Sequence, residues 1–127
     1  MRAIKKPNSK LALLTILATS LVAFVPMSFA KDVTPLQAWQ MINQQALVID
    51  VRTTEEFNEG HIEGAINIPF ENIVEGVTQL GLKNDDNIVL YCRSGRRSGI
   101  ADNALTQAGF INTANAGGVD ALIQSKP

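Results

Sequence analysis

Cysteine, histidine, tryptophan and tyrosine each occur once in this chain of 127 residues. A single cysteine, Cys92, cannot form an internal disulfide, so this is not a domain held together by disulfides, as many small exported proteins are. One histidine (His61) and one cysteine, without ligand spacing, do not make a metal site, and we expect neither a metal nor a cofactor. A lone thiol in an exported protein indicates a reactive residue or an intermolecular bridge. The alternative is a buried side chain that behaves as a small hydrophobe.

The chain also lacks an apolar run long enough to span a membrane. The longest, Leu11–Val25, is shorter than the ~20 residues that a spanning helix needs. Basic residues precede it, and the small residues Ser28 and Ala30 follow it at the spacing of a signal-peptidase site. We therefore predict a signal peptide over residues 1–30, cleaved after Ala30, and a periplasmic domain over residues 31–127 that does not associate with the membrane. A retained membrane anchor is the alternative.

Positive charge is scarce in the predicted mature chain. The sequence has 11 basic and 12 acidic residues, and residues 1–30 contain four of the basic and none of the acidic ones. The mature chain therefore has 7 basic and 12 acidic side chains, a balance of −5. Such a domain is a poor candidate for binding nucleic acid or an anionic membrane. Its arginines Arg93, Arg96 and Arg97 gather beside Cys92 and predict a local positive field.

The stretch around Cys92 has the pattern of a strand, a loop and a helix. Ile88–Tyr91 reads as a short buried strand, and an apolar-periodic helix is expected from about Ser98 to Ala108. A thiol between a strand end and a helix start lies near unpaired N–H groups and the positive end of the helix dipole. Such a place binds anions and favours thiolate over thiol. We interpret Cys92 as a nucleophile.

The rest of the mature chain alternates short apolar strands with helices, which predicts a parallel sheet covered on both faces. Asp50 and Cys92 each end a predicted strand, so both should lie at the carboxyl edge of the sheet, where ligands bind in such folds. The expected strands are 32–33, 46–49, 65–68, 88–91 and 111–114, and the expected helices are 35–43, 53–57, 73–80 and 98–108, followed by a turn and a helical stub over 117–123.

Several motifs together resemble the rhodanese family, and most of all its small, single-domain, exported bacterial sulfurtransferases. The resemblance implies a three-layer α/β/α fold with a five-stranded parallel sheet. It also implies that Cys92 takes a sulfane sulfur from a small anionic donor such as thiosulfate and passes it, as a persulfide, to a thiophilic acceptor such as cyanide or a thiol. The motifs are Asp50-Val-Arg52, Glu55-Glu-Phe57, Gly60-His61-Ile62-x-Gly64-Ala65-x-Asn67-Ile68-Pro69, Cys92-Arg-Ser-Gly-Arg-Arg97-Ser98 and Gly117-Gly118.

The resemblance makes the loop after the cysteine the substrate-binding element. Its N–H groups would surround the sulfur as an anion-binding nest, its arginines would steer a dianionic donor, and its glycine would adopt the dihedrals of the curl. Transfer through a covalent intermediate predicts ping-pong kinetics. The loop residues are Arg93, Ser94, Gly95, Arg96 and Arg97, with Ser98 in a supporting position.

Three other residues within the motifs have less specific interpretations. Asp50 could accept hydrogen bonds from the cysteine loop, pair with Arg52, or only end its strand. His61 suggests a general base, but transfer from a thiolate needs none, so we interpret it as structural. We expect a monomer.

Two other functions compete with sulfur transfer. Cysteine phosphatases and arsenate reductases have the motif His-Cys-x5-Arg, in which the arginine lies six positions after the cysteine. Here Tyr91 precedes the cysteine, and Arg97 lies five positions after it. This tighter loop suits a sulfur atom better than a tetrahedral oxyanion. A persulfide carrier that delivers sulfur to a partner protein would need the same loop as an enzyme, so the sequence leaves that alternative open.

Overall fold

The computed structural model describes residues 3–4, 20–21 and 31–127. Apart from its two described pairs of residues, the predicted signal peptide lies outside this part. None of the helices in this part of the chain has the length and apolar character of a membrane span. The elements are α1 (Pro35–Asn43), β1 (Leu47–Asp50), α2 (Thr54–Glu59), β2 (Ile66–Asn67), the 3-10 turn η1 (Phe70–Asn72), α3 (Ile73–Gln79), β3 (Ile88–Cys92), α4 (Arg96–Gln107), β4 (Thr113–Gly118) and α5 (Val119–Gln124).

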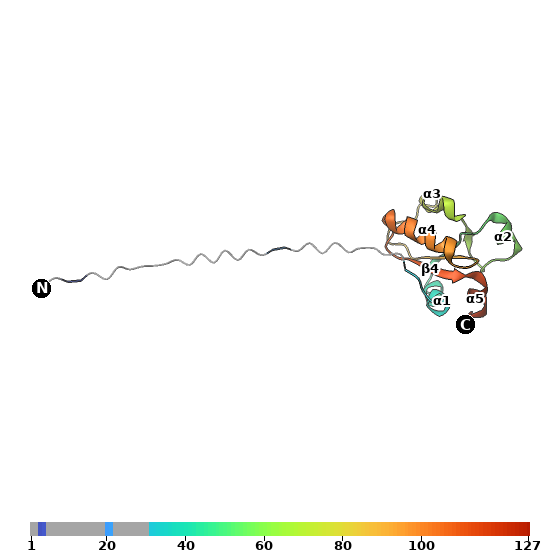
Figure 1. Cartoon of the computed structure of the whole chain (residues 1–127), viewed down its shortest axis with the longest axis horizontal. Helices are drawn as coiled ribbons and strands as arrows, with labels where there is room; N and C mark the ends of the chain where they lie inside the picture. Colours follow the sequence, from blue (N-terminus) through green and yellow to red (C-terminus); the bar gives the residue numbers. More distant parts are fainter. Residues whose placement is uncertain (1–2, 5–19, 22–30) are drawn as a thin grey trace.

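The strands form one parallel sheet in the order β2-β1-β3-β4. Helices α3 and α4 lie on one side of it and α1 and α5 on the other (Figure 1). Strand β3 is buried throughout and alternates between two cores: Ile88, Leu90 and Cys92 pack toward α3 and α4, while Val89 and Tyr91 pack toward α1 and α5. The α/β architecture with a parallel sheet and three layers is confirmed.

The expected fifth strand is wrong, because the described sheet has four strands. At its place beside β4, Asp32 makes a single parallel bridge to Asn115. Thr34 is the N-cap of α1 and forms a capping box with Gln37, and Pro35 is the first residue of the helix. Because the helix begins three residues after the bridge, the chain turns away before a strand can form.

Two predicted boundaries near Cys92 also move. Helix α4 begins at Arg96 rather than near Ser98, because Gly95 adopts a left-handed conformation (φ +94°) and ends the loop there. The last strand lies at residues 113–118, later than the expected 111–114. Its glycines, which suggested a turn, continue the strand, and Gly118 pairs with Cys92 across an irregularity in the register.

Candidate active site

Cys92 is the last residue of the central strand β3, and its side chain lies where the chain curls into α4. The residue is 1% exposed. Its Sγ accepts a hydrogen bond from the Gly95 N–H at 3.0 Å and lies 3.4 Å from the Ser98 hydroxyl. The three-residue loop and the first turn of α4 therefore both direct hydrogen-bond donors toward the sulfur at the end of β3.

These donors change the ionisation of the thiol. Burial alone would raise the pKa of Cys92, because it disfavours the charged thiolate. The Ser98 hydroxyl and the backbone N–H groups of Ser98, Ser94 and Gly95 oppose burial, and the pKa is lowered overall. The hydrogen bonds thus outweigh desolvation, and the site favours the nucleophilic form of the sulfur.

The paired glycines of β4 form the surface on which the cysteine loop rests. A Cβ on Gly118 would lie 2.5 Å from the Arg93 carbonyl oxygen, and a Cβ on Gly95 would lie 3.2 Å from the Gly117 Cα. Backbone therefore packs directly against backbone at both places. Because a side chain on Gly118 or Gly95 would prevent this approach, these two glycines allow the loop to pack closely on β4.

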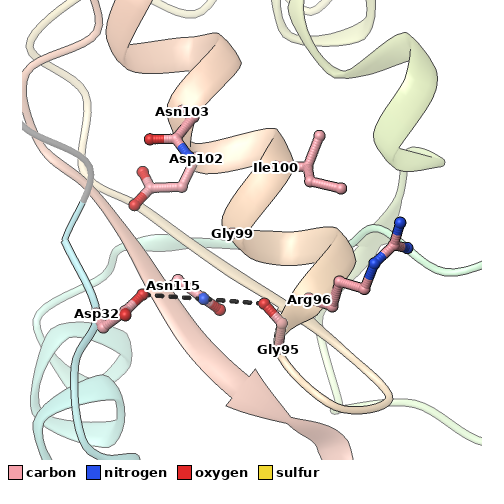
Figure 2. Close-up of a pocket in the computed structure, with 8 residues that line it drawn as sticks. All are labelled: Asp32, Gly95, Arg96, Gly99, Ile100, Asp102, Asn103 and Asn115. Atoms are coloured by element: carbon pink, nitrogen blue, oxygen red, sulfur yellow. Dashed lines mark hydrogen bonds between the residues drawn. The ribbon is translucent and has the colours of Figure 1, made fainter.

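Asn115 on β4 holds the loop from behind, and sequence reasoning missed it. Its Nδ2 donates to the Gly95 carbonyl and to Asp32 Oδ1, both at 3.0 Å (Figure 2). Its Oδ1 accepts from the Ser98 hydroxyl at 2.6 Å and from the Gly117 N–H at 3.0 Å. One amide thereby connects the loop, α4 and the N-terminal segment. Since asparagine is uncommon within strands, its residue type gave no signal, and only the strand register reveals it.

Glu56 partly neutralises the local positive field that the three arginines predicted. Arg97 makes a two-point ion pair with Glu56 at 2.7 and 2.9 Å, and Arg93, which is more exposed, approaches the same carboxylate at 3.4 Å. The Arg97 hydrogen bonds hold the pKa of Glu56 at about 2, well below its usual range. With Arg96 included, three arginines and one carboxylate leave a local charge of +2. Sequence reasoning missed this role of Glu56, which also completes the capping box that begins α2.

Arg97, in the first turn of α4, is the arginine that the site orients most firmly. Its pKa is raised chiefly by the hydrogen bonds to Glu56, and the negative charge of a Cys92 thiolate contributes further. The guanidinium is therefore close enough to Cys92 to sense the charge on the sulfur. Arg96, in contrast, lines a neighbouring pocket together with Asp32 and Asn103.

Asp50 pairs with Arg52, which selects one of its three predicted roles. Its carboxylate accepts Arg52 Nη2 at 2.6 Å, Nε at 3.0 Å and the backbone N–H at 2.9 Å, and both residues are buried. Arg52 also donates to the Gly60 carbonyl at 2.7 Å and lies over the Tyr91 ring. Among the described contacts, the Asp50 side chain bonds Arg52 and not the cysteine loop. The pair supports the end of β1 beside the site.

His61 is not among the residues that donate hydrogen bonds to Cys92 Sγ. Its ring stacks on Phe57 at 3.6 Å, and its Nδ1 is 2.8 Å from the Phe57 carbonyl oxygen. This position fits its interpretation as structural. Among the residues that the structure describes, no three His, Cys, Asp or Glu side chains gather where they could hold a metal ion.

Comparison with known proteins relates this arrangement to a family. The family model "Rhodanese-like domain" matches residues 34–124. The chain is 36% identical over 78 residues to the thiosulfate sulfurtransferase PspE of Escherichia coli, covering 61% of this chain and 75% of PspE. It is 37% identical over 84 residues to a putative mitochondrial thiosulfate sulfurtransferase of Schizosaccharomyces pombe, covering 58% of this chain but only 59% of that protein. A solved structure described as a rhodanese with anions from E. coli superposes with a TM-score of 0.59 at 34% identity, over 65% of this chain and 94% of that one.

Proposed function

The chain belongs to the rhodanese family, and from that premise we propose that it is a sulfurtransferase acting through a persulfide on Cys92. The proposed donor is thiosulfate or a similar sulfane sulfur compound, and the proposed acceptor is cyanide or a thiol. The observation that carries the proposal is the cradle of donors around Cys92 Sγ, with the Gly95 N–H at 3.0 Å and the Ser98 hydroxyl at 3.4 Å.

The first half of the reaction loads the enzyme. The Cys92 thiolate attacks the outer sulfur of thiosulfate, a sulfur–sulfur bond forms on the enzyme, and the sulfur–sulfur bond of the donor breaks. Sulfite leaves with the electron pair of that bond. The persulfide that remains carries its negative charge on the terminal sulfur, which the N–H groups of the curled loop stabilise.

The second half restores the thiolate. The carbon of cyanide, or the sulfur of an acceptor thiolate, attacks the terminal sulfur of the persulfide. The enzyme sulfur–sulfur bond breaks, and its electron pair returns to Cys92 as thiolate, while thiocyanate or a new persulfide leaves. No proton is transferred in either half, so the lowered pKa of Cys92 replaces a general base.

Ser98 can serve both protonation states of the cysteine. Its single hydroxyl hydrogen donates to Asn115 Oδ1 at 2.6 Å or turns to Cys92 Sγ at 3.4 Å. When it turns to a thiolate, Asn115 Oδ1 still accepts the Gly117 N–H. The buried amide is then never left without a donor, so the switch costs little.

The burial of Cys92 and the paired arginines restrict the substrate. A thiol that is 1% exposed is reached by a narrow, protruding atom such as the outer sulfur of thiosulfate or the carbon of cyanide. Glu56 fixes the planar guanidinium of Arg97 beside the sulfur. Arg97 is therefore the proposed contact for the anionic part of the donor, and Arg93 and Arg96 add attraction at longer range.

The test is to mix residues 31–127, which contain both packed cores, with thiosulfate alone and no acceptor. We expect one sulfite released per protein and a mass gain of one sulfur atom, both absent in Cys92→Ser. Ser125→Ala is the control, because this serine is exposed just after α5, away from the cysteine loop, and its loss should leave loading unchanged. A folded, reduced protein that gains no sulfur would refute sulfur transfer. Hydrolysis of an aryl phosphate by that protein would then favour the phosphatase alternative.

A further inference from the structure

The proposed sulfur transfer gives no role to the buried carboxylate of Asp102. Asp102, on α4, is completely buried, and burial raises its pKa. Its Oδ1 accepts the Thr113 hydroxyl, and its Oδ2 accepts the backbone N–H of Lys31 at 2.7 Å. The ion pairs among the described residues do not include Asp102. A buried carboxylate is costly unless a cation compensates it, so this position calls for one.

The nitrogen that faces Asp102 is the one that signal cleavage would release. Lys31 directly follows the predicted cleavage site at Ala30. In the uncut chain this nitrogen is an uncharged amide with one hydrogen. Hydrolysis adds water across the peptide bond: Ala30 leaves with a carboxylate, and the nitrogen of Lys31 becomes an α-ammonium at neutral pH.

We propose that removal of residues 1–30 completes an ion pair between the new α-ammonium of Lys31 and the buried carboxylate of Asp102. The proposal rests on the predicted cleavage after Ala30 and is independent of sulfur transfer. The amide of the uncut chain gives the carboxylate a hydrogen bond but no charge, whereas the α-ammonium supplies both. Processing would therefore add charge compensation to a contact that the fold already makes.

The surroundings hold the nitrogen of Lys31 in place for this role. The Lys31 carbonyl accepts the Asn115 N–H at 2.7 Å, and the Val33 N–H donates to the Asn115 carbonyl at 3.0 Å. Asp102 points from α4 toward the segment that carries Asp32 (Figure 2). The Asp32 carboxylate further raises the pKa of Asp102, so a cation at this position would compensate two negative charges.

The ion pair would also support the active site. The segment that it anchors forms the bridge to Asn115, and the Asn115 side chain holds the Gly95 carbonyl and the Ser98 hydroxyl. Arg96 lines the same pocket as Asp32 and Asp102, so the pocket lies directly beside the cysteine loop.

The experiment compares two N-termini of the domain. One protein begins at Lys31, and the other carries one extra methionine before Lys31, which keeps the net charge but turns the nitrogen of Lys31 back into an amide. Each is made with Asp102, with Asp102→Asn and, as a matched control at an exposed carboxylate, with Asp120→Asn. The readouts are the pKa of the α-amine by NMR titration and the folding equilibrium constant by urea unfolding at pH 7.

In the protein that begins at Lys31, we expect an α-amine pKa about one unit above the ordinary 7.7–8.0 of a free N-terminus. A pKa that folding raises by one unit corresponds to a tenfold larger folding equilibrium constant, so the extra methionine should lower this constant by about tenfold. Because the pKa of the α-amine is raised on folding, this difference is full below about pH 7.7, as long as Asp102 is ionised, and disappears as the pH rises past about 9. Asp102→Asn should abolish both effects, and Asp120→Asn should keep both.

Two results would overturn the proposal. The first is an effect of the extra methionine that is equal with Asp102 and with Asp102→Asn, accompanied by an ordinary α-amine pKa. The second is a mass for the processed protein, made from the full chain in a bacterium that exports it, that does not correspond to a start at Lys31. Neither readout depends on turnover, so failure here is distinct from failure of the proposed sulfur transfer.

Discussion

Replacing Ser98 with alanine tests how the site activates its thiol. The change removes the hydroxyl 3.4 Å from Cys92 Sγ and leaves the backbone donors in place. A hydrogen bond to a charged group contributes about 1.5–3 kcal/mol, and the neutral bond that Ser98 gives up on Asn115 is worth about 0.5–1.5 kcal/mol. The net preference for the thiolate is then about 1–1.5 kcal/mol, so Ser98→Ala should raise the pKa of Cys92 by about one unit.

The pH dependence of alkylation by iodoacetamide measures this pKa directly, because Cys92 is the only cysteine of the chain. Ser94→Ala is the control: its hydroxyl is on an exposed residue, and its N–H remains. The fold should survive Ser98→Ala, since Asn115 Oδ1 keeps the Gly117 N–H. An unchanged or lower pKa of Cys92 in Ser98→Ala would show that the hydroxyl does not stabilise the thiolate.

Three further changes probe the support of the site. Gly118→Ala places a Cβ 2.5 Å from the Arg93 carbonyl oxygen, so the cysteine loop must shift. We expect turnover to fall by up to about 100-fold, while the circular dichroism spectrum stays unchanged. Normal turnover would contradict the close packing of the loop on Gly118. Glu56→Gln should destabilise the protein fully above about pH 4.5, and this loss of stability should vanish as the pH falls toward 2, because folding lowers the pKa of the Glu56 carboxylate to about 2. Urea unfolding at several pH values measures the loss. A loss that does not depend on pH would refute the prediction. Asp50→Asn breaks the buried pair with Arg52 and should cost about 3–5 kcal/mol in urea unfolding without changing the thiol pKa; a raised thiol pKa would mean that Asp50 acts on the loop after all.

The strand and loop around Cys92 were predictable because their signals are local. A buried apolar run, a polar loop and an apolar-periodic helix follow one another within about twenty residues, and the parallel sheet follows from the alternation of such units. The helices expected to start near residues 35 and 53 were predictable for the same reason, and in the structure Thr34 and Thr53 cap them in capping boxes. Local chemistry decides these features, so one sequence is enough to find them.

The features that were missed depend on pairing between distant segments. Asn115 reaches the site through the sheet register, and Glu56 reaches it through its ion pair with Arg97 in the first turn of α4. Residue type alone reveals neither contact. The last strand was displaced because its asparagine and two glycines disfavour strands intrinsically, whereas tertiary pairing with β3 overrides that preference. The fifth strand was lost because a helix start at Pro35 left only one residue to pair.

Thiocyanate formation from thiosulfate and cyanide by residues 31–127, measured with Cys92→Ser alongside, tests the role of Cys92 in sulfur transfer. We expect turnover with ping-pong kinetics, in which parallel double-reciprocal lines show that sulfite leaves before cyanide binds, and no turnover in the serine variant. Turnover that persists in Cys92→Ser would contradict the assignment of the nucleophile. No turnover by a folded, reduced protein that still loads one sulfur would contradict the enzyme and leave a persulfide carrier.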